Sequence, residues 1–468
     1  MADTGYISFI KQNAPFLATG ALLSFLSSFG QTYFISIFGG EIRESYGLSN
    51  GDWGLIYMIG TGASAAVMVF AGGLADRFRV KQLGITVILL LGLSCILFVL
   101  NPIAALLPLV IFFLRFFGQG MTTHVATVAM ARWFIATRGR ALAVAAMGFM
   151  LGEATLPLIM VWLKSRIDWH IIWIGCAFFC FAMAPVLFRL LRLERTPQSA
   201  AQSDQSTGLF NKHWTRADAL RHPIFWAMAP AVMSFSGFGT AFWFHQVHFA
   251  EIKGWSHLAL VAAFPLGTIT LLFSTIIYGW LVDRVGAVRL LPFYLIPYIF
   301  AFVLHWYAPS LAWTALAIIL MGAAGGGQAT LLNACWAEFF GTLNLGSIKA
   351  ATTALMVLGS AIGPGLSGWL IDKGVGFETQ MLGYAATFFV AAILLLYPVS
   401  VAHRSATAAY IHVIRTLPAV TDMAFTDLQN QTSQGRHVQP LGNLMTQHTK
   451  SCRDRTAIIA VFPLTCDD

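Results

Sequence analysis

The segment Phe112-Phe113-Leu114-Arg115-Phe116-Phe117-Gly118-Gln119-Gly120 places one arginine among phenylalanines, within an apolar run from Ala104 to Met130. The run is long enough to cross a bilayer as a helix, which needs about 20 apolar residues. A charged side chain at that depth costs roughly 3 kcal/mol, so Arg115 is expected to face protein or a water-filled cavity instead of lipid. The segment therefore predicts a membrane helix and a use for its charge.

The whole chain has the composition of a helical membrane protein. Of its 468 residues 57% are hydrophobic and only 10% are charged, and the mean hydropathy is +0.71. Apolar runs of roughly twenty residues recur along the chain, whereas the shorter alternating segments of a membrane β-barrel are absent. We therefore expect an all-α membrane protein in contact with the lipid bilayer.

Twelve such runs can be placed along the chain. They lie at about residues 15–38, 54–75, 83–100, 104–130, 141–163, 170–188, 223–248, 257–281, 290–307, 311–335, 350–371 and 380–401. The even number puts both termini on one side, where the loops carry fifteen Lys and Arg against five on the other side. Because positive loops stay in the cytoplasm, we expect a multi-pass plasma (inner) membrane protein with cytoplasmic termini. The net charge of +8 then reflects topology, and we expect no nucleic-acid partner.

The chain also carries an internal repeat. The loop sequence Gly72-Gly73-Leu74-Ala75-Asp76-Arg77, after the second run, is echoed 207 residues later by Gly279-Trp280-Leu281-Val282-Asp283-Arg284. The same spacing pairs Glu44 with Glu251, Gly47 with Gly254, Ser49 with Ser256, Gly118 with Gly325, Gly120 with Gly327, Gly139 with Gly346, Gly152 with Gly359 and Pro157 with Pro364. We therefore predict 12 transmembrane helices in two pseudo-symmetric six-helix bundles, residues 1–189 and 223–403. A cytoplasmic loop, 190–222, joins them, and a cytoplasmic polar tail without structure, 404–468, follows.

These features resemble a known family. Six plus six spans with the paired Asp-Arg loops resemble the major facilitator superfamily over about residues 10–403, and Arg115 with Gly118 and Gly120 resembles the signature of its fourth helix. Arg132-Trp133-Phe134 and the segment 359–364 are most similar to its monocarboxylate-transporter-like branch of bacterial type. The resemblance implies a transporter, not an enzyme, whose cavity is lined by helices one, four, seven and ten. It also implies that Asp76, Arg77, Asp283 and Arg284 form cytoplasmic latches that hold the outward-open state.

Two charged residues fall well inside the predicted spans, Arg115 in the fourth and Glu153 in the fifth. Both are ~15 Å from the outer ends of their helices, so their side chains can meet near the bilayer midplane. The corresponding positions in the second half are Gly322 and Ser360, so the duplicated fold does not itself require the charges. Two explanations stay open. One is a buried salt bridge that locks the helices together, and the other is a site where Arg115 binds an anionic group or Glu153 accepts a proton.

Other polar residues in the predicted cavity helices are candidates for contact with a solute. They are Gln31 and Tyr33 in helix one, His245 in helix seven, and Gln328 and Asn333 in helix ten. His245 could titrate during transport, although a histidine in an interfacial aromatic belt is as often a packing residue. No spacing of His, Cys, Asp or Glu indicates a metal site and no nucleotide-binding motif is present, so we expect neither metal nor cofactor.

The sequence thus predicts a secondary active transporter that moves a small organic solute by alternating access. The solute is expected to be an anion such as a carboxylate, carried with a co-transported proton by a monomer. A proton-driven exporter of metabolites or drugs is the alternative, because helix five shows part of the exporters' glycine-proline pattern between Gly148 and Pro157. A membrane-embedded sensor or enzyme is a remote alternative, since no metal cluster or nucleophile elbow is found.

Overall fold

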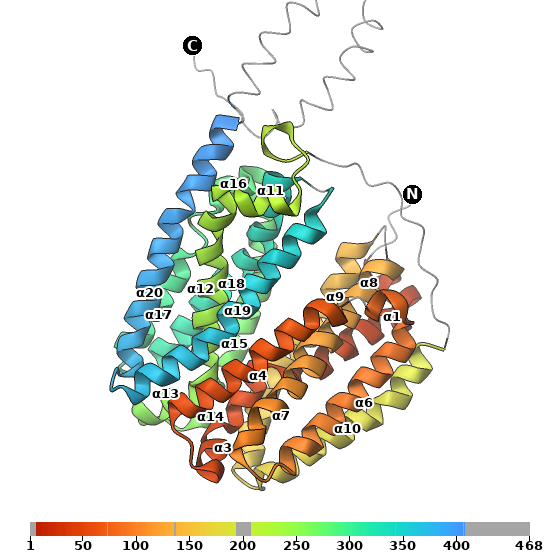
Figure 1. Cartoon of the computed structure of the whole chain (residues 1–468), viewed down its shortest axis with the longest axis vertical. Helices are drawn as coiled ribbons and strands as arrows, with labels where there is room; N and C mark the ends of the chain where they lie inside the picture. Colours follow the sequence, from red (N-terminus) through yellow and green to blue (C-terminus); the bar gives the residue numbers. More distant parts are fainter. Residues whose placement is uncertain are drawn as a thin grey trace, which may run out of the picture.

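A computed structural model describes residues 6–72, 74–134, 137–192, 207–341, 343–405 and 407. Every regular element in these ranges is a helix (Figure 1). The first bundle contains α1 (Tyr6–Leu26), η1 (Ser27–Gly30), α2 (Thr32–Ile35), η2 (Ser36–Phe38), α3 (Gly39–Tyr46), α4 (Asn50–Ala71), α5 (Leu74–Arg77), α6 (Val80–Val99), η3 (Ala104–Leu106), α7 (Leu107–Phe113), η4 (Leu114–Thr122), α8 (Thr123–Trp133), α9 (Arg138–Lys164) and α10 (Trp169–Leu190).

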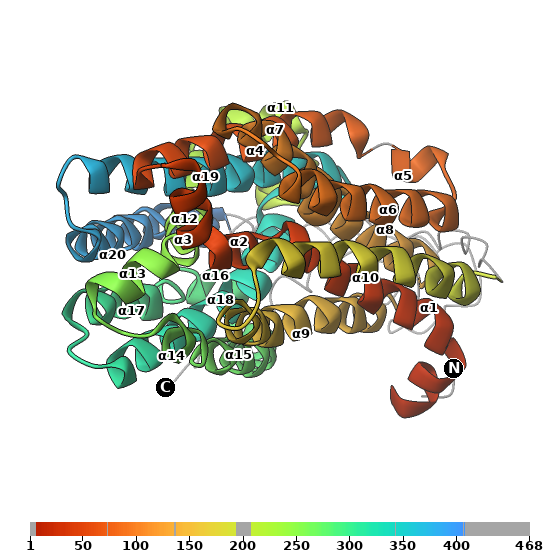
Figure 2. The same ribbon diagram turned by 90° about the horizontal axis from the view of Figure 1, so that it is seen from below.

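The second bundle follows a connecting segment. That segment contains η5 (Leu209–Asn211) and α11 (Arg216–Arg221), and the bundle contains α12 (Pro223–Phe244), α13 (Gln246–Ile252), α14 (His257–Val261), α15 (Phe264–Val285), α16 (Ala287–Leu290), α17 (Ile296–Tyr307), α18 (Leu311–Phe340), α19 (Leu345–Asp372) and α20 (Phe377–Leu394). Figure 2 shows the two bundles side by side. We call the end of the molecule where α1 begins and α11 lies the terminal end, and the opposite end, at α3, α13 and α14, the distal end. Of the predicted structureless tail, 404–468, residues 404, 405 and 407 are helical, and the remainder lies outside the described residues.

The number of membrane passages agrees with the sequence. Ten helices in the described part are long and apolar enough to span a membrane, and residues 8–46 form an eleventh span that is bent by 48°. The shorter apolar helix α17 completes twelve passages. The predicted all-α membrane fold of two six-helix bundles is confirmed.

The internal repeat extends to backbone geometry. Gly47 and Gly254 have left-handed φ values of 62° and 68° and follow the corresponding helices α3 and α13. Gly60 packs so tightly that a Cβ would meet Ile111, and Gly267, which is 207 residues further on, would meet the corresponding Ile318. The same backbone conformation and the same tight packing thus recur 207 residues apart, which supports a duplicated unit.

The one departure from the loop pattern has a backbone explanation. In the second half Gly286 follows α15 with φ 88°, a conformation that residues with a Cβ rarely adopt. In the first half Arg79 has φ −66°, which any residue adopts. The first loop therefore does not need the glycine that the second loop keeps.

Three predicted spans are less regular than expected. The first is interrupted between Leu26 and Gly39 by short 3₁₀ and α segments, with Gln31 in an extended conformation. The fourth contains the nine-residue π-helix η4. The ninth was expected from residue 290, but 291–295 form turns and α17 begins only at Ile296, just before Pro297, whose missing N–H suits a helix start.

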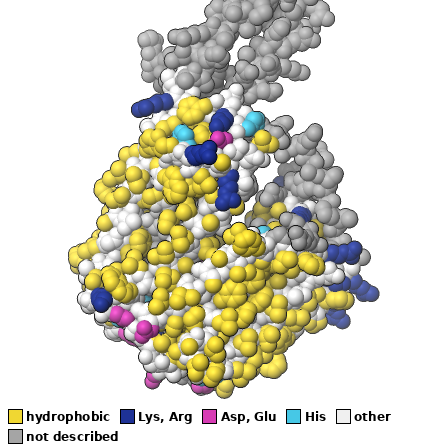
Figure 3. Space-filling model, in the orientation of Figure 1, with side chains coloured by type: hydrophobic (Ala, Val, Ile, Leu, Met, Phe, Trp, Pro, Cys, Tyr) yellow, Lys and Arg dark blue, Asp and Glu magenta, His cyan; other side chains and the backbone are white. Residues whose placement is uncertain are grey.

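The bundles meet at the distal end and diverge toward the terminal end. The contacts between them are made by α4 with α19, by α9 with α14 and α15, and by α2 with α12. The space-filling view shows the surface hollowed between the bundles on the side of the terminal end (Figure 3). The conformation is thus closed at the distal end and open at the terminal end.

Candidate functional site

Arg115 lies in η4, in the middle of the fourth span, and is only 1% exposed. Its Nη1 donates hydrogen bonds to the Gly30 carbonyl oxygen (3.0 Å) and to Thr32 Oγ1 (3.2 Å), where the first span is broken. The guanidinium Cζ lies 5.4 Å from the centroid of the Tyr57 ring, and the Tyr57 hydroxyl is hydrogen-bonded to Thr32. These contacts fix one edge of the guanidinium.

The other edge of the Arg115 guanidinium has no hydrogen-bond partner among the described residues. Both Nε and Nη2 are buried without an acceptor. These two N–H groups point in the same direction and form the fork with which arginine binds a carboxylate or a similar oxyanion. Because buried donors without acceptors are costly, this edge is suited to receive an anion.

Glu153, on α9, is partly exposed and faces a partly open cavity of about 100 Å³ between the bundles. Tyr33 shares the cavity wall from the first bundle, while Trp243, Thr268 and Tyr298 are among the lining residues from the second. Within the described ranges no Lys, Arg or His forms an ion pair with Glu153. An ionised carboxylate here would lack a counter-charge, and protonation would remove its negative charge.

Arg115 and Glu153 pack near the same broken segment of the first span but do not form an ion pair in this conformation. Thr32 holds Arg115, whereas the next residue, Tyr33, lines the Glu153 cavity and donates from Oη to Ser28 Oγ (2.8 Å). The sequence places both charges at one depth, and the structure puts both beside residues 28–33. Arg115 and Glu153 are therefore linked through their contacts with residues 28–33 and not by a direct salt bridge.

The remaining predicted solute contacts lie in different surroundings. Gln31 is buried at the break of the first span. His245 is buried and its ring Nε2 lies 3.0 Å from the Pro364 carbonyl oxygen, so it ties α12 to α19 within the second bundle. Gln328 accepts a hydrogen bond from the Tyr294 hydroxyl, and the exposed Asn333 donates to its own helix at Ala329. None of these four lines the Glu153 cavity.

The predicted latch residues lie at the terminal end. Asp76 and Arg77 belong to α5, and their side chains lie outside what the structure describes. Asp283 and Arg284 are exposed at the end of α15, with the Arg284 guanidinium 4.4 Å from the Trp280 ring centroid. Their latch role stays a prediction.

Two side chains that the sequence did not single out connect the bundles at the distal end. Gln246 is fully buried, and its Nε2 donates to Ser36 Oγ (2.7 Å) and to the Tyr33 carbonyl oxygen (3.3 Å). Asp372 Oδ2 accepts from Ser49 Oγ (2.6 Å) and from the Gly51 N–H (2.9 Å) at the start of α4. The comparison of halves could have pointed to Gln246, because the corresponding residue is Gly39.

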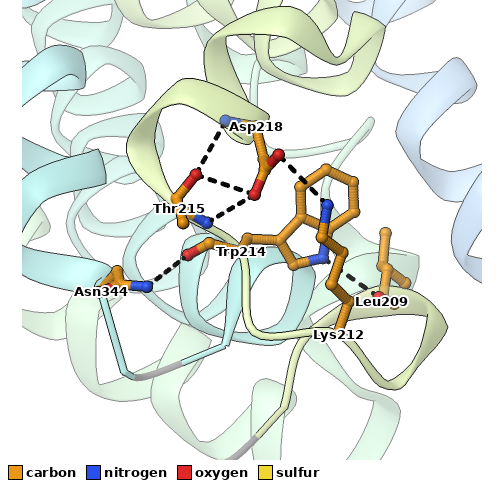
Figure 4. A network of polar contacts seen from close by, with 6 residues as sticks. All are labelled: Leu209, Lys212, Trp214, Thr215, Asp218 and Asn344. Carbon is orange, nitrogen blue, oxygen red and sulfur yellow. Dashed lines mark hydrogen bonds and ion pairs between the residues drawn. The ribbon is translucent and has the colours of Figure 1, made fainter.

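Part of the connecting segment is docked on the second bundle (Figure 4). Trp214 packs edge-on against Phe340, its Nε1 donates to the Leu209 carbonyl oxygen (3.1 Å), and its own carbonyl oxygen accepts from Asn344 Nδ2 (2.9 Å). Thr215 and Asp218 cap α11 reciprocally, and the Thr215 hydroxyl holds the pKa of Asp218 below its usual range. This part of the predicted loop therefore has its own structure.

Two six-helix bundles that close at one end around a buried arginine are typical of membrane transporters of small solutes. The chain belongs to the Major Facilitator Superfamily, whose family model matches residues 20–347 and 268–448. Since this is a family of transporters, the chain is not an enzyme.

Individual relatives are distant. A probable sulfoacetate transporter, SauU, of Cupriavidus necator is 26% identical over 162 residues, which span 34% of this chain and only 37% of that protein. Among solved structures, a bacterial homologue of the human lysosomal transporter Spinster, in an inward-facing and unoccupied conformation, matches with a TM-score of 0.61 at 15% identity. It covers 84% of this chain and 98% of its own. A variant of the nucleoside transporter NupG matches with a TM-score of 0.62 at 14% identity, covering 82% and 99%. These structures share the fold.

Proposed function

We propose that the chain is a secondary active transporter that carries a small organic anion, such as a carboxylate, together with a proton. The observation that carries this proposal is the buried fork of Arg115, whose Nε and Nη2 have no acceptor while Nη1 is held by the protein. An anchored, desolvated guanidinium recognises an oxyanion by two parallel hydrogen bonds. The name of the partial relative, a probable sulfoacetate transporter, is consistent with an organic anion.

Glu153 is the group that we propose for proton coupling. Its cavity lies at the contact between α9 and the second bundle, so it opens and closes as the bundles move. A carboxylate that reaches water in one conformation and is enclosed without a cation in another gains and loses a proton during the cycle. Residues 28–33 then relate the proton site to the anion site.

The alternating-access cycle follows from the two bundles. We propose that residues 1–189 and 223–403 rock against each other, with the terminal end and both termini in the cytoplasm of a plasma (inner) membrane. The conformation described above is then open to the inside. Arg132-Trp133-Phe134 supports placement in the monocarboxylate-transporter-like branch, and we propose that the monomer is the functional unit.

Uptake into proteoliposomes tests the proposal. Carboxylates, sulfonates, zwitterions and neutral solutes are compared, with an imposed proton gradient of either sign to separate import from export. Arg115→Lys keeps the charge but loses the fork, so we expect at least a tenfold higher KM for the anion, because each charge-assisted hydrogen bond contributes about 1.5–3 kcal/mol. Glu153→Gln should exchange solute across the membrane but fail to concentrate it.

One matched change in the second half serves as a control for Glu153. Ser360→Ala alters the position that corresponds to Glu153 and should leave both properties unchanged. Normal anion uptake by Arg115→Lys would overturn the assignment of the anion site. Concentrative uptake by Glu153→Gln would overturn the coupling role without affecting the anion site.

A further inference from the structure

Four basic residues form a patch at the terminal end of the first bundle, where α6 begins and α10 ends. They are Arg79, Lys81, Arg189 and Arg192, which we call the α6/α10 basic patch. Lys81 Nζ lies 3.7 Å from the centroid of the Phe188 ring, which brings the start of α6 beside the end of α10. Figure 3 shows Lys and Arg side chains gathered on this edge of the molecule.

The charge of the patch is not neutralised by any described carboxylate. Arg79, Arg189 and Arg192 are exposed, and no carboxylate of a described residue pairs with any of the four. The duplicated fold does not require basic residues at these four positions. The positions 207 residues further on are Gly286, Val288, Leu396 and Val399, none of which is charged.

An apolar face continues from the patch toward the distal end. On α6, Leu89, Leu93 and Leu97 are exposed at intervals of one helical turn, and on α10 the side chains of Phe178 and Val186 are exposed. Both helices are spans, with mean hydropathies of 2.5 and 2.3 over their most apolar windows. The basic patch thus lies at the membrane boundary, directly above a surface suited to acyl chains.

We propose that the α6/α10 basic patch binds the headgroup of an anionic phospholipid in the leaflet at the terminal end, with the acyl chains along α6 and α10. Cations at the level of the headgroups attract a phosphate that bears net negative charge. A lipid also places its acyl chains on the apolar face below, whereas a soluble phosphate compound makes no use of that face. A zwitterionic lipid brings no net charge and is bound less well. This inference rests on the membrane fold and is independent of the transported solute.

Lipid titration of the delipidated full-length protein, followed by native mass spectrometry, tests the proposal. The wild type should bind phosphatidylglycerol in preference to phosphatidylcholine, and inorganic phosphate should not displace it. Arg189→Gln combined with Arg192→Gln should weaken binding of phosphatidylglycerol about thirtyfold, since each basic residue near a membrane surface contributes about 1 kcal/mol. Arg189→Lys with Arg192→Lys should retain it.

A matched control removes the same charge from the second bundle. Arg216 and Arg404 are exposed at the terminal end, and Arg216→Gln with Arg404→Gln should leave the lipid preference unchanged. Equal loss in this control, or wild-type preference in the Arg189/Arg192 glutamine variant, would overturn the proposal. Displacement by inorganic phosphate would assign the patch to a free anion and overturn it as a lipid site.

Discussion

Replacement of Gln246 by leucine should shift the protein toward a conformation that is open at the distal end. Gln246 Nε2 joins the second bundle to Ser36 and to the Tyr33 carbonyl oxygen, and its Oε1 lies 3.3 Å from His257 Nε2. Leucine has a similar volume but makes none of these hydrogen bonds. The two bonds between bundles contribute about 1 kcal/mol each, so the equilibrium between closed and open distal ends should change by about 2 kcal/mol, or roughly thirtyfold.

The polar nature of this contact explains why the effect falls on the conformational equilibrium instead of on folding. When the distal end opens, water reaches the amide, the hydroxyl and the carbonyl, and replaces the hydrogen bonds that they lose. In Gln246→Leu the closed state leaves Ser36 and His257 short of a partner, whereas the open state hydrates them. The closed state alone is therefore penalised.

Spin-label distances in lipid nanodiscs measure this equilibrium without any solute. Labels at Ser45→Cys on α3 and Ile252→Cys on α13 report the separation of the bundles at the distal end, because both positions are exposed. Cys95, Cys176, Cys180 and Cys335 are buried and do not interfere, and Cys452 and Cys466 are replaced. Gln380→Leu is the control, since Gln380 is buried and its Nε2 donates within the second bundle to the carbonyl oxygens of Ser367 and Val375. An unchanged distance distribution in Gln246→Leu, or an equal change in the control, would refute the role of Gln246.

Three further changes test the fold. Gly254→Ala places a residue with a Cβ at φ 68° and should lower the free energy of unfolding by about 1–2 kcal/mol. Thermal unfolding in detergent measures this, and a variant as stable as the wild type would contradict it. Gly326→Ala would bring a Cβ to 2.5 Å from the Thr275 backbone nitrogen and should destabilise the α15–α18 contact by about 1–3 kcal/mol. Gly279→Ala, which meets nothing within 4 Å, should be neutral, and equal losses would contradict this packing. The pKa of Asp218 is lowered, so the α11 cap should be intact above the ordinary aspartate pKa and be lost as pH falls through the lowered pKa. Reduced protection of the α11 amides on acidification, relative to their intrinsic exchange rate at each pH, checks this, and Asp218→Asn should remove the pH dependence.

Features that repeat along the chain could be predicted from the sequence. The spacing of 207 residues identifies Gly47 and Gly254 as equivalent, and both have left-handed φ. The twelve apolar runs correspond to the twelve passages because a bilayer requires each span to satisfy its own backbone hydrogen bonds. The equal depth of Arg115 and Glu153 stays a prediction, since it was counted along regular helices and Arg115 lies in a π-helix.

Contacts between distant segments could not be predicted in this way. Gln246 meets Ser36 across 210 residues, and nothing local to either residue indicates that the bundles close on one another there. The break at Gln31 contains no proline, and the π-helix at 114–122 has no signature in composition, so both were expected to be regular helix. These irregularities depend on packing against other helices, in particular on the close approach of Gly30 to Gly118.

The π-helix around Arg115 limits how the second half could acquire the same chemistry. A wide π turn changes the direction in which later side chains leave the helix, and α18, its counterpart, is an uninterrupted α-helix. At Gly322 a side chain would overlap the Gly267 carbonyl oxygen. A single substitution to arginine there would break the α15–α18 contact before it created an anion site. The asymmetry at Arg115 therefore involves backbone and side chain together, whereas Glu153 and its counterpart Ser360 differ only in side chain, because α9 and α19 are both α-helices.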